Sequence, residues 1–132
     1  MTEKNLAEPE RPKDLFHKMS ARDSTLIEFA FELLSVNVHG NAAAHGFHEG
    51  EYNPAEKIAL MHSELSEALD AIRKNIQKSD HVPEFTGEEE EMADAIIRIV
   101  EYSRHRSLRL AEAIIAKHNY NTTRPYKHGK KF

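Results

Sequence analysis

Two short segments of the sequence place acidic side chains at a spacing suited to metal binding. Glu64 and Glu67 are three residues apart, and so are Glu91 and Asp94. In a helix, residues at i and i+3 lie on one face, so each segment would present a pair of carboxylates. If the two helices pack side by side, four carboxylates converge. Carboxylate oxygens suit a hard cation such as Mg²⁺, which also binds waters and substrate phosphates.

The other interpretation of each pair is a solvated helix face, which is the commoner situation for acidic pairs at this spacing. The first pair does not fit it well. Glu64 borders the apolar arc of its helix, and Leu60 and Ala71 lie between it and Glu67 on the helical wheel. Charges interleaved with apolar residues are costly unless they have a partner such as a metal. The second pair lies on a polar side with Arg98, and taken alone it predicts solvent exposure.

Four segments have the apolar periodicity that is typical of amphipathic helices. The expected helices run from about Asp23 into the Gly40–Gly50 segment, from Asn53 to about Gln77, from Thr86 through Val100, and from Ser107 to about Asn119. The second has the clearest start, because Asn53 can cap it, Pro54 suits the first helical position and Glu56 completes a capping pattern.

The alternation of β-branched residues that predicts strands is absent. We therefore predict an all-α four-helix bundle. Residues 1–22, which include Pro9 and Pro12, are expected to be a mobile arm. Residues 23–132 are expected to form one domain with a basic C-terminal tail.

Composition narrows the class of protein further. The chain has 132 residues, enough for one core, and a net charge of −4. This charge hides an acidic middle, with 13 acidic and 4 basic residues from Glu49 to Asp94, and a basic end, with 8 basic and 1 acidic residue from Arg104 to Phe132. The acidic balance weighs against a nucleic-acid partner. The absence of cysteine excludes disulfide scaffolds, thiol nucleophiles and iron–sulfur clusters.

Membrane and secretion signals are not found. No apolar run approaches the roughly 20 residues that span a bilayer. The segment from Met1 to Asp14 is charged and lacks the apolar stretch of a signal peptide. We therefore expect a cytoplasmic protein without a membrane partner.

Both acidic segments resemble, together with their neighbours, the motifs of the MazG-type all-α nucleotide pyrophosphohydrolases. The matching stretches are residues 60–69, residues 91–99 and the tail residues 117–125, and the resemblance covers about residues 24–132. The family's first motif is often written with two adjacent glutamates before the spacer, and here Ser63 takes the first of these places.

The resemblance implies a Mg²⁺-dependent hydrolase, with Mn²⁺ as a substitute, that converts an NTP or dNTP to the monophosphate and pyrophosphate. Glu64, Glu67, Glu91 and Asp94 would hold the metal. Either Glu64 or Glu67 would take the proton of the attacking water. The number of metal ions, the phosphorus that is attacked and the choice between the two glutamates stay open at this point.

The basic tail would supply positive charge to a site that otherwise repels a triphosphate. By resemblance to the family, Lys117, Asn121 and Arg124 are expected to contact the phosphates or the sugar. For Lys130 and Lys131 a solvated role is favoured.

The segment before the second expected helix would line the nucleoside end of the pocket, as the equivalent segment does in the family. Asn41 could contact a base edge and Phe47 could stack on the base, although packing in the core is the commoner role for a phenylalanine. His39, His45 and His48 also lie near this segment, but their spacing is not diagnostic of a transition-metal site. No Glu-x-x-His pattern occurs, which argues against a ferritin-like di-iron bundle.

A single four-helix protomer would leave broad apolar arcs uncovered, because the third expected helix is apolar over about half its circumference. We therefore expect a homodimer or homotetramer, as the family forms. Two other functions remain open. One is a non-enzymatic interaction protein with a solvated acidic face and a basic docking tail. The other is a helical bundle that binds a metal without catalysis.

Overall fold

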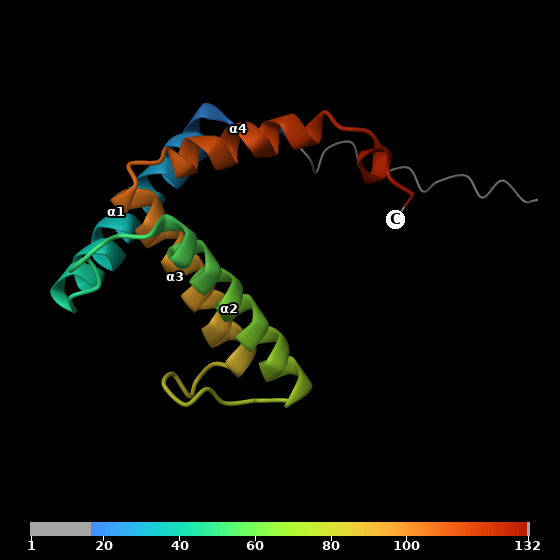
Figure 1. Cartoon of the computed structure of the whole chain (residues 1–132). Helices are drawn as coiled ribbons and strands as arrows, with labels where there is room; N and C mark the ends of the chain where they lie inside the picture. The colour runs from blue at the N-terminus through green and yellow to red at the C-terminus, as the bar shows by residue number, and fades with distance from the viewer. Residues whose placement is uncertain (1–16, 132) are drawn as a thin grey trace, which may run out of the picture.

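The structure is a computed structural model, and it describes residues 17–131 (Figure 1). It consists of helices, with no strand in this part of the chain, which confirms the all-α prediction. The elements are α1 (Ala21–Ala44), α2 (Pro54–Arg73), α3 (Gly87–His105), α4 (Leu110–Thr122) and the 3₁₀ helix η1 (Tyr126–Gly129). Most of the predicted arm lies outside the described residues, and its last two residues belong to α1.

The helices do not form a closed bundle. Helices α2 and α3 run side by side in opposite directions and make the most extensive contact in the structure (Figure 1). Helix α1 packs against α3, and α4 packs against α1. Helix α4 projects away from the α2–α3 pair (Figure 1).

The start of each of the first three helices is set by a polar N-cap. Asn53 accepts hydrogen bonds from the first turn of α2, as predicted. Helix α3 also starts after Thr86, as predicted, and there Thr86 and Glu89 form a reciprocal capping box that was not predicted from the sequence. Helix α1 begins earlier than expected. The hydroxyl of Ser20 accepts a hydrogen bond from the backbone N–H of Asp23, so Ser20 is the N-cap and Asp23 lies in the first turn.

The ends of the first three helices share one geometry. Gly46, Asn75 and Ser107 each follow the C-cap with a positive φ, of 79°, 54° and 53°. At each end the next residue's N–H returns to a carbonyl in the last turn, as the Phe47 N–H does to the Ala42 oxygen. Helix α1 therefore continues through Gly40 to Ala44, and α2 ends four residues before the predicted Gln77. Because Ser107 closes α3, the fourth helix begins at Leu110 rather than at Ser107.

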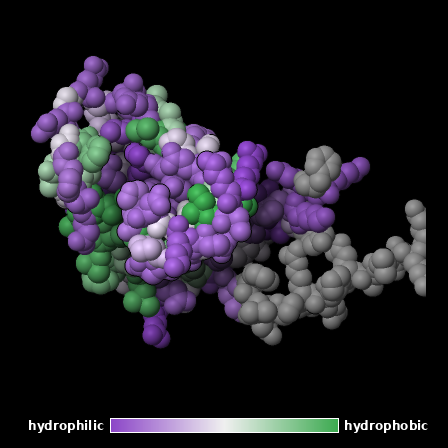
Figure 2. All heavy atoms as spheres, turned by 90° about the horizontal axis from the view of Figure 1, so that it is seen from below, coloured by the Kyte–Doolittle hydropathy of each residue, from purple (hydrophilic) through white to green (hydrophobic). Residues whose placement is uncertain are grey.

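The hydrophobic core is small and lies mainly between α2 and α3. Among the described residues, the buried hydrophobic side chains are Met61, Ala68, Ala71, Ala95, Val100 and Ile115. Many larger apolar side chains are exposed, including Phe29 on α1, Leu69 and Ile72 on α2 and Ile96 on α3. Figure 2 shows apolar side chains gathered along one side of the molecule.

No helix in the range 17–131 combines the length and the apolar composition needed to cross a membrane.

Candidate metal and nucleotide site

Three of the four predicted carboxylates converge between α2 and α3. One oxygen atom from each of Glu64, Glu67 and Glu91 lies within 4.8 Å of the other two. Glu64 is only 6% exposed, Glu91 is half-buried and Glu67 faces solvent. The i, i+3 spacing on α2 and the packing of α2 against α3 bring these groups together.

Asp94 lies about one turn from Glu91 along α3 and is not part of the close group of three. It lines the adjacent pocket together with Glu64. Burial, followed by the negative charge of Glu64, raises the pKa of Asp94 above its usual value of 3.8. Asp94, the fourth predicted carboxylate, therefore interacts electrostatically with Glu64 but lies on the side of the pocket.

The concentration of negative charge is strongest at Glu91. Burial, the charge of Glu67 and a hydrogen bond with Glu67 raise the pKa of Glu91 from 4.5 to about 7. A divalent cation bound among these carboxylates would relieve this repulsion. Three carboxylate oxygens within reach of one point fit the preference of Mg²⁺ for a few hard oxygen ligands, with the remaining places taken by water or phosphate.

Arg98 on α3 is a partner of this cluster that the sequence did not assign. Its Nε lies 2.5 Å from Oε1 of Glu64, and its side chain is 41% exposed. Glu91 and Arg98 on the polar side of α3 are partly buried against the site, whereas Asp94 is exposed, as the helical wheel of α3 indicated. The i, i+4 spacing places Arg98 on the same face of α3 as Asp94, but it does not indicate the contact with Glu64 on the other helix.

A pocket of about 240 Å³ adjoins the carboxylates and is walled by α1, α2 and α3. Asn41 and Phe47 line it together with Glu64 and Asp94, so the structure brings these four predicted residues together. Phe47 is 65% exposed. Packing in the core, the commoner role for this residue type, is therefore wrong here, and its ring is open to a ligand.

Lys57 is a second cation of the pocket wall that sequence reasoning missed. It precedes Glu64 by seven residues, about two helical turns, so both lie on the same face of α2. Its Nζ lies 5.5 Å from the centroid of the Tyr52 ring. The spacing of Lys57 and Glu64 can be read from the sequence. The packing of α1 and α3 around them, which forms the shared pocket, cannot.

The predicted basic residues of the tail are not brought to the carboxylates within one chain. Lys117, Asn121 and Arg124 are on or just after α4, and none of them lines the pocket that contains Glu64. Lys117 and Arg124 flank the Tyr120 ring, at 4.7 Å and 5.9 Å from its centroid. In Figure 1 this end of α4 lies far from the middle of α2 and α3.

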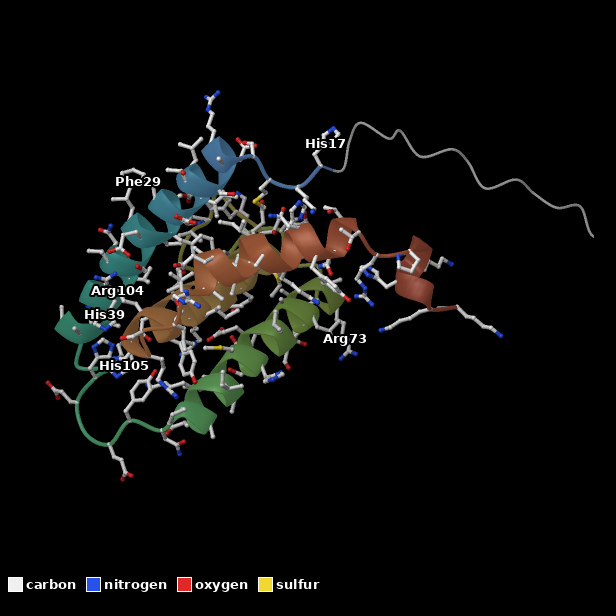
Figure 3. The ribbon with its side chains drawn as sticks, turned by 90° about the horizontal axis from the view of Figure 1, so that it is seen from above. His17, Phe29, His39, Arg73, Arg104 and His105 are labelled. Atoms are coloured by element: carbon white, nitrogen blue, oxygen red, sulfur yellow. The ribbon has the colours of Figure 1, made fainter. Side chains whose placement is uncertain are left out.

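A larger cavity, of about 580 Å³, lies between α1, α3 and α4 and contains none of the predicted site residues. One of its lining residues, Arg104, contacts the carboxylate of Glu32 at 3.0 Å and the hydroxyl of Ser35 at 3.1 Å. Figure 3 shows Arg104 near His39 and His105, where α1 meets α3. The larger cavity lacks the convergent carboxylates, so the smaller pocket is the better candidate for metal-dependent chemistry.

Comparisons of the chain with protein-family models, curated proteins and solved structures found no match.

Proposed function

We propose that this chain is a cytoplasmic hydrolase of the MazG type, which uses Mg²⁺ to convert a nucleoside triphosphate to the monophosphate and pyrophosphate. The observation that carries the proposal is the convergence of Glu64, Glu67 and Glu91 beside a pocket. The exposed Phe47 ring lines that same pocket. The resemblance of residues 60–69, 91–99 and 117–125 to the family's motifs supports the same function.

The order of residues along α2 suggests how the substrate would lie. Asn41 and Phe47 would bind the nucleoside end, and Lys57 would lie beside it. Glu67 is ten residues beyond Lys57, or about 15 Å along the helix. The phosphates would therefore extend from the pocket toward Glu64, Glu67 and Glu91.

Each charged residue would have a separate task in the reaction. Glu64, Glu67 and Glu91, with Asp94 on the pocket side, would hold the cation, which would supply positive charge to the phosphate oxygens and lower the pKa of a nearby water. Glu67 is the most exposed member of the close group, so we favour it over Glu64 as the group that takes the proton of the attacking water. Water adds to phosphorus as a phosphoanhydride bond breaks, and Arg98 would offset the charge that develops.

The basic tail would act on a neighbouring chain. Lys117, Asn121 and Arg124 lie far from the carboxylates of their own chain, and the exposed apolar side chains of α2 and α3 offer a surface for a second copy. A two-fold homodimer would let the tail of one chain approach the pocket of the other.

The proposed activity can be tested with the purified chain and a panel of NTPs and dNTPs, measured with Mg²⁺ and with EDTA. We expect pyrophosphate release from at least one nucleotide, with Mn²⁺ able to replace Mg²⁺. Release of orthophosphate alone would assign a different phosphorus as the point of attack. If no nucleotide is hydrolysed but Mg²⁺ still binds, the chain is a metal-binding bundle rather than this enzyme.

A further inference from the structure

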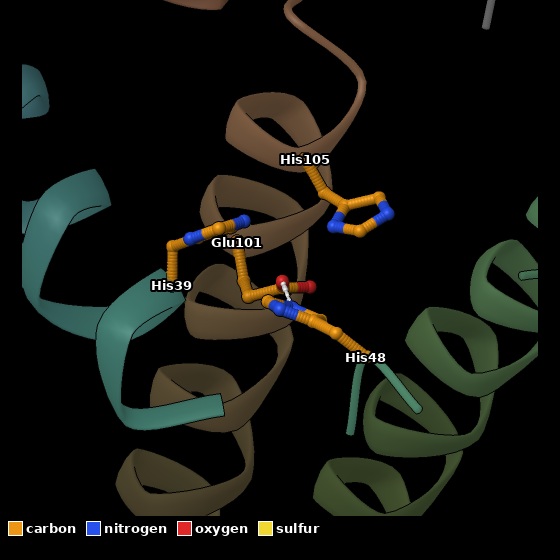
Figure 4. A group of neighbouring side chains, drawn as sticks. All are labelled: His39, His48, Glu101 and His105. Carbon is orange, nitrogen blue, oxygen red and sulfur yellow. Dashed lines mark hydrogen bonds and ion pairs between the residues drawn. The ribbon is translucent and has the colours of Figure 1, made fainter. Parts of the chain in front are cut away.

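A second group of metal-ligand side chains lies at the other end of α3, where α3 meets α1. His39, His48, Glu101 and His105 each offer one ligand atom, and these four atoms lie within 4.8 Å of one another. All four residues are partly buried. Figure 4 shows the three imidazoles and the carboxylate arranged around a common centre.

Three different elements contribute to this group, which we call the histidine cluster. His39 comes from α1, His48 from the connection between α1 and α2, and Glu101 and His105 from α3. Glu101 and His105 are four residues apart and therefore share one face of α3. None of the four is a neighbour in sequence of the Glu64–Glu67 segment.

The turn after α1 is shaped so that His48 points back toward α3. Gly46 and Gly50 both have φ of 79°, a conformation that glycine adopts without strain. These two residues bracket His48, and its Nε2 lies 2.5 Å from Oε1 of Glu101. The ring of Tyr52 stacks on His105 at a centroid distance of 4.0 Å, which fixes one further member of the cluster.

The three imidazole rings lie unusually close together. The ring centroid of His48 is 4.4 Å from that of His39 and 4.6 Å from that of His105. Imidazoles in this arrangement would repel one another if protonated.

We propose that His39, His48, His105 and Glu101 form a site for zinc or a similar first-row transition metal. Three imidazole nitrogens and one carboxylate oxygen are a donor set of the kind that Zn²⁺ binds with tetrahedral geometry. Mg²⁺, by contrast, takes oxygen ligands. With bonds of about 2.0–2.1 Å, tetrahedral ligand atoms are about 3.3 Å apart. Modest side-chain rotations would bring the ligand atoms, which now lie within 4.8 Å of one another, to this spacing and would separate His48 Nε2 from Glu101 Oε1.

A metal at this position would tie three separate elements together. The turn that bears His48 also bears Phe47, and α1 carries Asn41 close to His39. The metal would hold this pocket wall against α3, which makes the site a structural clamp. The clamp does not depend on the proposed hydrolase activity.

The sequence contained part of this signal. His39 and His48 were two of the three histidines considered as a metal group, but His45 does not belong to the cluster. The Nδ1 atom of His45 instead lies 2.8 Å from the carbonyl oxygen of Asn41, within the last turn of α1. The spacing of Glu101 and His105 was visible, but their approach to His39 depends on how α1 crosses α3.

The test uses the full chain without a polyhistidine tag, stripped of metal and titrated with Zn²⁺ against a chromophoric chelator. The matched variants are His48→Gln and His105→Gln, with His45→Gln as the control from the same turn. We expect one Zn²⁺ per chain, unchanged in the control and at least about tenfold weaker in each cluster variant. Titration with Co²⁺ should give the intense visible absorption of a tetrahedral site, and excess Mg²⁺ should not abolish it.

Thermal unfolding separates loss of the site from loss of the fold. Zn²⁺ should raise the Tm of the wild-type chain and of His45→Gln, and should raise it much less for His48→Gln, with all variants helical by circular dichroism before metal is added. The proposal is overturned if the wild-type chain binds no Zn²⁺. It is also overturned if His45→Gln loses as much affinity as the cluster variants, or if Glu67→Gln alone abolishes binding. A cluster variant that fails to fold is replaced by Glu101→Gln, for which the same loss is expected.

Discussion

The Nε atom of Arg98 on α3 lies 2.5 Å from Oε1 of Glu64 on α2, so the most buried carboxylate of the candidate site is paired with an arginine. This pair joins the two helices that make the most extensive contact in the structure. It also places a positive charge beside three carboxylates that otherwise repel one another.

Replacement of Arg98 tests how much this pair stabilises the fold. In EDTA, we expect Arg98→Gln to lower the free energy of unfolding by roughly 1–2 kcal/mol, because it leaves the buried Glu64 carboxylate unpaired. Added Mg²⁺ should stabilise the variant more than the wild-type chain, since the cation would replace the lost charge. Urea unfolding measures both effects. The exposed Arg73 serves as the control, and an equal effect of Arg73→Gln would show that the pair contributes nothing specific.

Glu91 gives a prediction about pH. Its pKa is raised from 4.5 to about 7 in the folded chain, so the native state holds a proton that the unfolded state releases. Stability contributed by this group is therefore present below pH 4.5 and is lost as the pH rises to about 7. In EDTA, Glu91→Gln should be more stable than the wild-type chain at pH 8 by roughly 1–3 kcal/mol, and nearly equal to it at pH 4.5. Urea midpoints across this range measure the difference, and a difference independent of pH would contradict the account.

Two helical glycines should respond in opposite ways to alanine. At Gly87 an added Cβ would lie 2.9 Å from Cγ2 of Ile76, where α3 begins against the end of α2. We expect Gly87→Ala to destabilise the fold by roughly 1–3 kcal/mol. At Gly40 an added Cβ meets nothing within 4 Å, so Gly40→Ala should stabilise α1 by about 0.5–1 kcal/mol. Thermal or urea unfolding measures the stability of both variants. If Gly87→Ala is stabilising like Gly40→Ala, the packing at Gly87 is not as described.

The parts of the fold that local chemistry determines were predicted well. The cap at Asn53 and the acidic first turn after Thr86 indicated two helix starts correctly, because both signals depend on a few adjacent residues. The ends were harder. Gly46 is one of several glycines in its segment, and Ser107 has little preference for a positive φ, so the start of α4 was misplaced. Asn75 does favour a positive φ and is a stop signal that was not used in the prediction, so the end of α2 was also misplaced.

The candidate site also has features that local helix geometry predicts and features that depend on how the helices pack. The pairing of Glu64 with Glu67 follows from helix geometry, and the motif indicated Glu91 as their neighbour. The contact of Arg98 with Glu64 depends on how α2 and α3 are rotated and aligned, which helix periodicity does not define. The tail residues Lys117 and Arg124 depend on whether a second chain is present, and one chain's sequence does not specify that arrangement.

The proposed exchange of tails between chains can be tested by mixing inactive variants. Glu67→Gln should lack the proton acceptor, and Arg124→Ala should lack a phosphate contact supplied to the partner. Refolded together, they should recover up to about one quarter of the wild-type activity, because half the dimers are mixed and each mixed dimer has one complete site. This recovered activity should appear when the two variants are refolded together and not when they are refolded separately. No recovery, with mixed dimers verified by mass spectrometry, would contradict an exchange of tails between subunits.

The most direct test of the central claim compares Mg²⁺-dependent pyrophosphate release by the wild-type chain, Glu67→Gln and Glu56→Gln. Both substitutions keep the size of the side chain on α2, but only Glu67 belongs to the carboxylate cluster. We expect Glu67→Gln to lose at least about 100-fold in kcat, as for loss of a general base, while Glu56→Gln keeps full activity. Turnover by Glu67→Gln at the wild-type rate would contradict the claim that these carboxylates perform the chemistry.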